Sequence, residues 1–187
     1  MRLVVLVSGR GSNLQAIFDA IEGGRLDAEV AAVISDSPDA YALKRAEKAH
    51  VPGFCIERRD HSSRADFEAA LAACAEAARP DMVVLAGFMR VLGPVFLDRF
   101  LGRVINIHPS LLPSFPGLEA QRQALEAGVR YTGCTVHFVD YGVDSGPIID
   151  QRVVPVLAGD DVERLSARIL EQEHDLLVDV IRRLGCK

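Results

Sequence analysis

The chain has 187 residues, of which 49% are hydrophobic and 25% are charged, and its formal net charge is -5. This length and composition predict one globular domain with a sizeable core, and they exclude a disordered or fibrous protein. The negative charge argues against broad binding to nucleic acid or to an anionic membrane, so we expect small-molecule partners. No apolar run approaches ~20 residues, and the first run is too short for a signal peptide, which predicts a cytoplasmic protein. The cysteines are widely spaced and are expected to be free thiols.

The N-terminal segment has the order strand, glycine turn and helix. Residues 3–7 form an apolar run typical of a strand buried on both faces, and Ser-Gly-Arg-Gly-Ser-Asn follows at 8–13. Ser12 or Asn13 can cap the helix that begins there. The free N–H groups and positive dipole end of such a helix suit a phosphate. A monophosphate is favoured because Leu14 stands where a dinucleotide fingerprint needs its third glycine, and a tight turn without a ligand is the alternative.

Alternating strands and helices continue to residue 108 and predict the fold class. In chain order, strands are expected at 29–34, 54–56, 82–86 and 104–108, and helices at 41–50, at 60–78 and from Pro94. This alternation predicts an α/β, Rossmann-like fold with a doubly wound, mostly parallel sheet. The fourth strand then starts beside the first, and a crevice opens between their carboxyl ends, flanked by loops at 9–13 and 87–92. We expect a ligand site in this crevice.

The strand at 104–108 carries two polar side chains at its carboxyl end. Because alternate side chains of a strand share a face, Asn106 and His108 project the same way, while the apolar residues between them enter the opposite layer. Pro109 cannot donate to a sheet ladder, so the strand is expected to end at His108, where parallel sheets bind ligands. The alternative is that both side chains only satisfy the following turn. The loops at 9–13 and 87–92 and the end of this strand are expected to converge on the same crevice, which favours a ligand site.

A late antiparallel pair of strands is expected after a helix at 120–127. The segment 132–139 alternates and predicts a half-buried strand, and 148–156 predicts another. The short connection between them makes the two strands antiparallel neighbours, so the sheet is mixed. Asp144 lies in that connection among glycines and a proline, where capping of the turn is the alternative to a functional role. The role of His137 stays open.

A long C-terminal helix, capped by Asp160 and Asp161, completes the chain. Glu173 lies on its apolar stripe or at the border, where a carboxylate is costly unless it has a partner. A substrate can be that partner, and a rim residue with its carboxylate in solvent is the alternative. No group of His, Cys, Asp and Glu residues has metal-ligand spacing, so no metal is expected.

Several motifs, taken together, resemble those of a known family. They are Ser-Gly-Arg-Gly-Ser-Asn at 8–13, Leu-Ala-Gly-Phe-Met-Arg at 85–90, Asn-Ile-His-Pro-Ser-Leu-Leu-Pro at 106–113, Thr-Val-His-Phe-Val at 135–139, Asp-Ser-Gly-Pro-Ile-Ile at 144–149 and Gln-Glu-His at 172–174. With these motifs the chain resembles, almost end to end, the folate-dependent formyltransferases in the branch that formylates a glycinamide ribonucleotide. The third motif is specific to formyltetrahydrofolate enzymes as a class, and the first and last indicate this branch.

The resemblance implies one formyltransferase domain over 1–187, with a phosphate-binding half at about 1–100 and a catalytic and folate-binding half at about 101–187. It implies that 10-formyltetrahydrofolate is the co-substrate and that its formyl group passes to the amine of N1-(5-phospho-D-ribosyl)glycinamide in purine biosynthesis. It further implies small-molecule substrates, no metal, no nucleic acid and no membrane, and it allows a homodimer.

Site residues are carried over from the same resemblance. The catalytic trio is Asn106, His108 and Asp144. The ribonucleotide-binding residues are Gly11, Ser12, Asn13, Leu170, Glu171, Gln172 and Glu173. The folate-binding residues are Arg64, Met89, Arg90, Val91, Leu92, Asn106, Val139, Asp140, Tyr141, Gly142, Val143 and Asp144.

The chemistry of these residue types agrees with the trio. Attack of an amine on a formyl carbon creates a tetrahedral oxyanion, to which an Asn amide and an imidazolium can donate. A carboxylate at Asp144 can help to remove the amine proton through water. Glu119 and Gln121 stand where many relatives carry histidines or other polar residues, so that wall of the site is expected to differ. Relatives often continue past the position of Lys187, which leaves room for a difference in stability or in dimer contacts.

Three other functions share some of these motifs. Methionyl-tRNA formyltransferase needs an additional tRNA-binding domain and formyltetrahydrofolate hydrolase an additional regulatory domain, and neither is expected to fit into 187 residues. A nucleotide-binding sensor on the same fold would need the phosphate loop without the trio. Tetrahydrofolate that appears only when both substrates are present would distinguish the transferase from all three.

Overall fold

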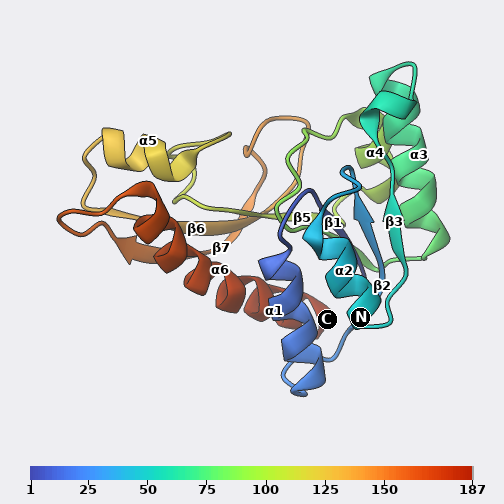
Figure 1. The fold of residues 1–187 in the computed structure, drawn as a ribbon, viewed down its shortest axis with the longest axis horizontal. Coiled ribbons are helices and arrows are strands. Elements are labelled where there is room, and N and C mark those ends of the chain that lie inside the picture. Colours follow the sequence, from blue (N-terminus) through green and yellow to red (C-terminus); the bar gives the residue numbers. More distant parts are fainter. Residues whose placement is uncertain (187) are drawn as a thin grey trace.

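The computed structural model describes residues 1–186 and contains the elements that the sequence predicts (Figure 1). The strands are β1 (Arg2–Val7), β2 (Glu29–Ser35), β3 (Gly53–Cys55), β4 (Met82–Leu85), β5 (Val104–His108), β6 (Tyr131–Phe138) and β7 (Ile148–Pro155). The helices are α1 (Ser12–Glu22), α2 (Tyr41–Lys48), α3 (Arg64–Ala77), α4 (Pro94–Leu97), α5 (Ala120–Glu126) and α6 (Val162–Gly185), with 3-10 turns η1 (Arg58–Asp60) and η2 (Asp98–Phe100). Lys187 lies outside the described residues, and so does the prediction about stability and dimer contacts at this end of the chain.

The strands form one mixed sheet in the order β3-β2-β1-β4-β5-β6-β7. Strands β1 to β5 pair in parallel, and β6 and β7 add to β5 in antiparallel orientation. The predicted doubly wound, mostly parallel sheet with a late antiparallel part is confirmed.

The sheet separates two hydrophobic cores. In β1, Leu3, Val5 and Val7 point into a core shared with α1, α2 and α6, and Val4 and Leu6 point into a second core shared with α3 and α4. All five side chains are fully buried, which is why this strand contains no alternating polar residues. Helices α1 and α6 lie side by side over one face of the sheet (Figure 1).

The loops that follow β1 and β4 meet at the carboxyl edge of the sheet. The Ser8 N–H donates to the Gly87 carbonyl (3.0 Å), and Ser8 Oγ accepts from the Met89 N–H (2.9 Å). Strand β5 continues the sheet next to β4, with Asn106 beside Leu85. The predicted crevice therefore lies at the ends of β1, β4 and β5.

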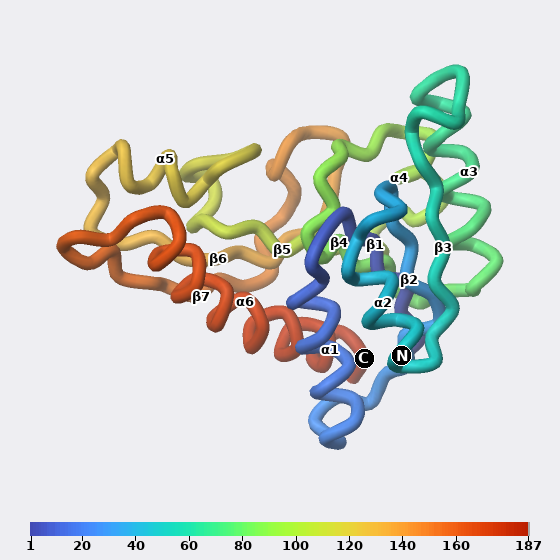
Figure 2. Tube along the Cα trace, in the orientation of Figure 1, coloured from blue at the N-terminus to red at the C-terminus, as the bar shows by residue number. Residues whose placement is uncertain are grey.

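Helix α6 runs along the sheet from the α5 end of the molecule toward the two chain ends (Figure 2). Its buried residues recur along its length, so an amphipathic stripe holds it to the sheet. Asp161 caps it by accepting from the Arg164 N–H (2.8 Å), while Asp160 accepts from the Leu157 N–H (2.8 Å). No helix within residues 1–186 is long and apolar enough to cross a membrane.

The prediction of a half-buried β6 is wrong. Residues 132–137 are all buried, because α6 packs on the strand and the loop after β5 covers it as well. Thr135 Oγ1 donates to the Ser110 carbonyl (2.7 Å) and accepts from the Leu112 N–H (3.1 Å) in that loop. Thr135 is thus buried with hydrogen-bond partners instead of facing water, whereas the buried Thr132 Oγ1 has no partner among residues 1–186.

Candidate active site

A cavity of ≈ 1140 Å³ lies at the carboxyl edge of the sheet, with walls from segments far apart in sequence. The predicted site residues in its wall are Asn13, Met89, Arg90, Val91, Leu92, Asn106, His108, Val139, Asp140, Gly142, Val143, Asp144, Leu170 and Glu173. The predicted residues outside the wall are Gly11, Ser12, Arg64, Tyr141, Glu171 and Gln172, and their binding roles stay predictions. Glu119 and Gln121 also line the cavity.

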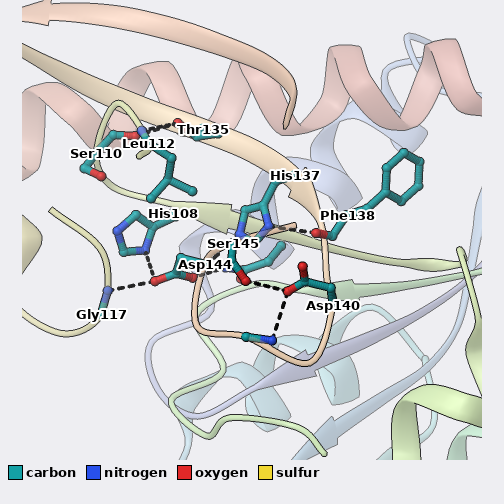
Figure 3. A network of polar contacts seen from close by, with 12 residues as sticks. His108, Ser110, Leu112, Gly117, Thr135, His137, Phe138, Asp140, Asp144 and Ser145 are labelled. Atoms are coloured by element: carbon teal, nitrogen blue, oxygen red, sulfur yellow. Dashed lines mark hydrogen bonds and ion pairs between the residues drawn. The ribbon is translucent and has the colours of Figure 1, made fainter. Parts of the chain in front are cut away.

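The predicted catalytic trio lies together in this wall. His108 Nδ1 is 3.3 Å from Asp144 Oδ2 (Figure 3), and Asn106 Nδ2 donates to Asp144 Oδ1 at 3.4 Å. Asn106 and His108 occupy alternate positions at the end of β5, and Asp144 comes from the β6–β7 connection. His108 is only 5% exposed, so its interactions are shielded from bulk water.

Both ring nitrogens of His108 face hydrogen-bond acceptors. Nε2 lies 2.9 Å from the Phe115 carbonyl oxygen. A carbonyl can only accept, so Nε2 carries a proton. Nδ1 faces the Asp144 carboxylate. An imidazolium would donate to both acceptors, whereas a neutral ring protonated at Nε2 would donate only to the Phe115 carbonyl.

His137, whose role the sequence left open, is part of this site. Across the β5–β6 pairing it stands opposite Asn106, and it is 2% exposed. Its Nδ1 donates to the Phe138 carbonyl (2.8 Å; Figure 3), so Nε2 of the neutral ring accepts from Asn106 Nδ2 at 3.2 Å. This contact fixes the Asn106 amide with its N–H groups toward the trio. When protonated, Nε2 would instead face Asp144 Oδ1, 3.6 Å away.

Asp144 is held in an unusual conformation and in a favourable electrostatic environment. Its φ of 50° is rare for a residue other than glycine, and its Oδ2 accepts from the Gly117 N–H at 2.8 Å (Figure 3). Burial raises the pKa of Asp144, but the His137 ring, the Gly117 N–H and the charge of His108 outweigh burial and hold the pKa below its usual value. Asp144 is therefore ionised at neutral pH.

A second polar pair joins α1 to α6 in the cavity wall. Asn13 Nδ2 donates to Glu173 Oε2 (2.7 Å), and both residues are 7% exposed. The alternative of a rim residue with its carboxylate in solvent is therefore wrong. Burial raises the pKa of Glu173, and the Asn13 hydrogen bond opposes this without cancelling it. Asn13 Oδ1 is buried without a partner among the described residues, so the pair offers acceptors to a ligand with hydroxyl or N–H donors.

The loop before α1 is shaped by Gly11. Gly11 is the N-cap residue, with a φ of 69°, and no side chain caps the helix, so the predicted capping by Ser12 or Asn13 is wrong. Arg45 Nε donates to the Arg10 carbonyl (2.9 Å) and holds the loop against α2. The first-turn N–H groups of α1 are thus free of side-chain caps, as an anion site at a helix N-terminus requires.

Replacing Gly11 by alanine is expected to lower the free energy of unfolding by about 2–4 kcal/mol, because a strained φ and a steric clash add. A Cβ at this position would lie 2.6 Å from Ala42 Cβ. Urea denaturation measures the loss. The matched control is Gly24→Ala, whose φ is 67° but which has no atom within 4 Å of an added Cβ. Equal losses in the two variants would contradict the proposed role of the Gly11–Ala42 contact.

The site combines an Asn-His-Asp cluster with a helix N-terminus at the carboxyl edge of a Rossmann-like sheet, which is the arrangement expected of a transferase that acts on a phosphorylated substrate. The family model described as formyl transferase matches residues 1–181, a range that includes the whole cavity wall. The chain belongs to the formyl transferase family.

Individual relatives are more specific. The chain is 50% identical over 184 residues to the phosphoribosylglycinamide formyltransferase of Mycobacterium tuberculosis, covering 98% of this chain and 85% of that protein. It is similar to a crystal structure of glycinamide ribonucleotide transformylase 1 from Symbiobacterium toebii, with a TM-score of 0.96, 54% identity, and coverage of 97% of this chain and 86% of that chain. It is also 50% identical over 175 residues to the trifunctional purine biosynthetic protein adenosine-3 of Drosophila melanogaster. That match covers 92% of this chain but spans only 13% of the fly protein.

Proposed function

We propose that this chain transfers the formyl group of 10-formyltetrahydrofolate to the amine of N1-(5-phospho-D-ribosyl)glycinamide, giving the N-formyl ribonucleotide and tetrahydrofolate in purine biosynthesis. The observation that carries this proposal is the Asn106–His108–Asp144 cluster in the wall of one cavity, with His108 buried and its two partners half-buried. The cavity wall has chemically different parts on its two sides, as a reaction between two unlike substrates requires. The names of the relatives support the same reaction.

One part of the wall fits a phosphorylated ribose. The uncapped N-terminus of α1 suits the phosphate. The buried Asn13 Oδ1 and the Glu173 carboxylate are acceptors, and the hydroxyl groups of a ribose are donors that would satisfy them. We infer that Leu170, one turn before Glu173, packs against the same substrate.

The other part of the wall fits the flat ring system of a folate. The loop after β4 presents Met89 and Val91, which are 62% and 51% exposed, and the buried Leu92 also lines the cavity. Val139 and Val143 face the cavity from the β6–β7 side. Apolar side chains that remain exposed around a cavity favour binding of a ligand with an apolar ring.

The trio can stabilise the charge that develops during transfer. As the amine attacks the formyl carbon, the formyl oxygen gains negative charge, and Asn106 Nδ2 and His108 Nε2 are suitable donors to it. We infer that this oxygen takes the place of the Phe115 carbonyl, to which His108 Nε2 donates in the free protein. The ionised Asp144 can accept the proton of the amine through a water molecule.

We further infer that the chain acts as one domain on small-molecule substrates in the cytoplasm, without a metal and without nucleic acid. The continuous sheet joins the predicted phosphate-binding half to the predicted catalytic and folate-binding half. A homodimer remains a prediction that sedimentation of the purified protein can test.

The proposed function is tested by mixing the purified protein with each substrate alone and with both. We expect tetrahydrofolate to appear only when the formyl donor and the ribonucleotide are present together. Release of tetrahydrofolate from the donor alone would indicate a hydrolase. Binding of the ribonucleotide without any turnover would indicate a sensor.

Replacing Glu173 by glutamine is expected to raise thermal stability and weaken ribonucleotide binding. Folding raises the pKa of this acid, so its ionised form destabilises the native state above the unfolded pKa of ~4.3, and the neutral isostere removes that effect. We expect the melting midpoint at pH 7 to rise on the order of 2 °C, with the gain vanishing near pH 4.

The same variant should raise the KM for the ribonucleotide roughly 10-fold, because an acceptor for its hydroxyl groups is replaced by an amide. Asp175→Asn on the exposed side of α6 is the matched control. A lower melting midpoint together with an unchanged KM would refute both parts of the prediction.

A further inference from the structure

Glu68 on α3 is a buried carboxylate that lies outside the cavity wall. The residue is only 2% exposed. Its Oε1 accepts from Arg64 Nε (2.7 Å) and from the Gly93 N–H (3.0 Å). A buried carboxylate with two charge-assisted hydrogen bonds holds its partners strongly, because the surroundings have a low effective dielectric constant.

Arg64 extends this anchor to a second point on the loop after β4. Its Nη2 donates to the Val91 carbonyl at 3.1 Å. The peptide groups on both sides of Leu92 are therefore held by one side-chain pair, through the Val91 carbonyl and the Gly93 N–H. Leu92 itself lines the cavity and is 3% exposed. Within residues 1–186, neither backbone group of Leu92 forms a hydrogen bond.

The close approach of this loop to Glu68 depends on Gly93. An added Cβ would lie 2.9 Å from both carboxylate oxygens of Glu68 and 3.1 Å from Arg64 Nη2. The φ of Gly93 is -106°, which any residue can adopt. The absence of a side chain is thus required by the contact with the carboxylate and not by the backbone conformation.

We propose that Glu68 is a positioning residue for the formyl donor, acting through the loop at residues 89–93 and together with Arg64. The proposal rests on the assignment of this loop to donor binding in the proposed function. Its specific content is that Glu68 touches no substrate but sets the positions of the Leu92 backbone groups and of the apolar residues beside them. Removing the carboxylate should therefore weaken donor binding and leave ribonucleotide binding, on the opposite wall, unchanged.

The test compares Glu68→Ala with Glu68→Gln in steady-state kinetics. For Glu68→Ala we expect the KM for the donor to rise roughly 10-fold or more, while the KM for the ribonucleotide and kcat stay within about threefold of the wild type. Glu68→Gln retains an oxygen that can accept from the Gly93 N–H, and should recover most of the donor affinity. The Gly93 amide should exchange with solvent faster in Glu68→Ala than in Glu68→Gln, as NMR can measure.

The matched control is Glu76→Ala. Glu76 lies on the same helix and pairs with Arg99 at 3.1 Å, but this pair is exposed and does not touch the loop. We expect all kinetic constants of the control to match the wild type. If Glu68→Ala does not fold, Glu68→Asp keeps the charge with a shorter reach, and the same selective rise in the donor KM is expected for it.

Two results would overturn the inference. Folded Glu68 variants that raise both KM values equally, or neither, would show that the carboxylate supports only the fold. The proposed function is tested separately on the wild-type protein. It fails if the wild type releases no tetrahydrofolate when both substrates are present, or releases it from the donor alone, whatever the variants do. If the wild type and Glu68→Ala bind tetrahydrofolate with equal affinity in calorimetry, the positioning role of Glu68 is wrong and the proposed function is unaffected.

Discussion

Replacing His108 by alanine is expected to lower kcat at least ~10²-fold with little change in either KM, by analogy with the loss of one oxyanion donor. The His108 ring lies between the Asp144 carboxylate and the Phe115 carbonyl, and its Nε2–H can donate a hydrogen bond to the developing oxyanion. The negative charge on the formyl oxygen develops only in the transition state. A hydrogen-bond donor to this oxygen therefore raises kcat and contributes little to substrate binding in the ground state. Steady-state kinetics with each substrate varied in turn measures both quantities.

The matched control for this variant is His50→Asn. His50 is exposed, lies outside the cavity and has a φ of 56°, which asparagine tolerates. Its kinetic constants should equal those of the wild type. A His108→Ala protein that turns over normally, or that loses affinity for a substrate as much as it loses kcat, would show that the ring is not an oxyanion donor.

Replacing Asp144 by asparagine is also expected to lower kcat at least ~10²-fold, the range typical of a lost general base. The substitution keeps the shape of the side chain, and its oxygen can still accept from the Gly117 N–H. It removes the negative charge that faces His108 and the only ionised acceptor of the trio for the amine proton. An Asp144→Asn protein with wild-type kcat at all pH values from about 6 to 9 would exclude the carboxylate from the mechanism.

The same variant tests the electrostatics of the site through the pH dependence of stability. The pKa of Asp144 is lower in the folded protein than in the unfolded chain, so its ionised form stabilises the fold. That contribution is fully present above the unfolded pKa of ~3.9 and is lost as the pH falls through the lower folded value. The wild type should therefore be more stable than Asp144→Asn at pH 6, and the two should converge only as the pH falls below the lowered folded pKa of Asp144. A constant difference across this range would contradict the assignment.

The fold could be predicted because local patterns determine most of its elements. Strand β1 is an uninterrupted apolar run, and β5 ends at His108 because the residue after it is Pro109. Two polar residues at alternate positions of β5 indicated a site, and the order of strands and helices indicated where the crevice opens. These signals are all contained in short windows of sequence.

The residues that were missed depend on contacts between distant segments. His137 is placed opposite Asn106 by the register of β6 on β5, which no local pattern of either strand specifies. Thr135 is buried because the loop after β5 closes over it. Glu68 reads in the sequence as a helix-surface carboxylate four residues after Arg64, and only the loop that ends at Gly93 buries it. In all three cases a polar residue lies on a buried face of its strand or helix. Its role can be interpreted only when its hydrogen-bond partner is known.

The central claim is that the formyl carbon moves from the folate to the amine of the ribonucleotide on this protein. The most direct test uses a donor labelled with carbon-13 in the formyl group and follows the label by NMR during turnover. We predict that the labelled signal moves from the donor to a new secondary amide of the ribonucleotide, in equal amount to the tetrahydrofolate formed, and that His108→Ala slows this transfer. Label that appears as free formate, or that stays on the donor in the presence of both substrates, would contradict the account.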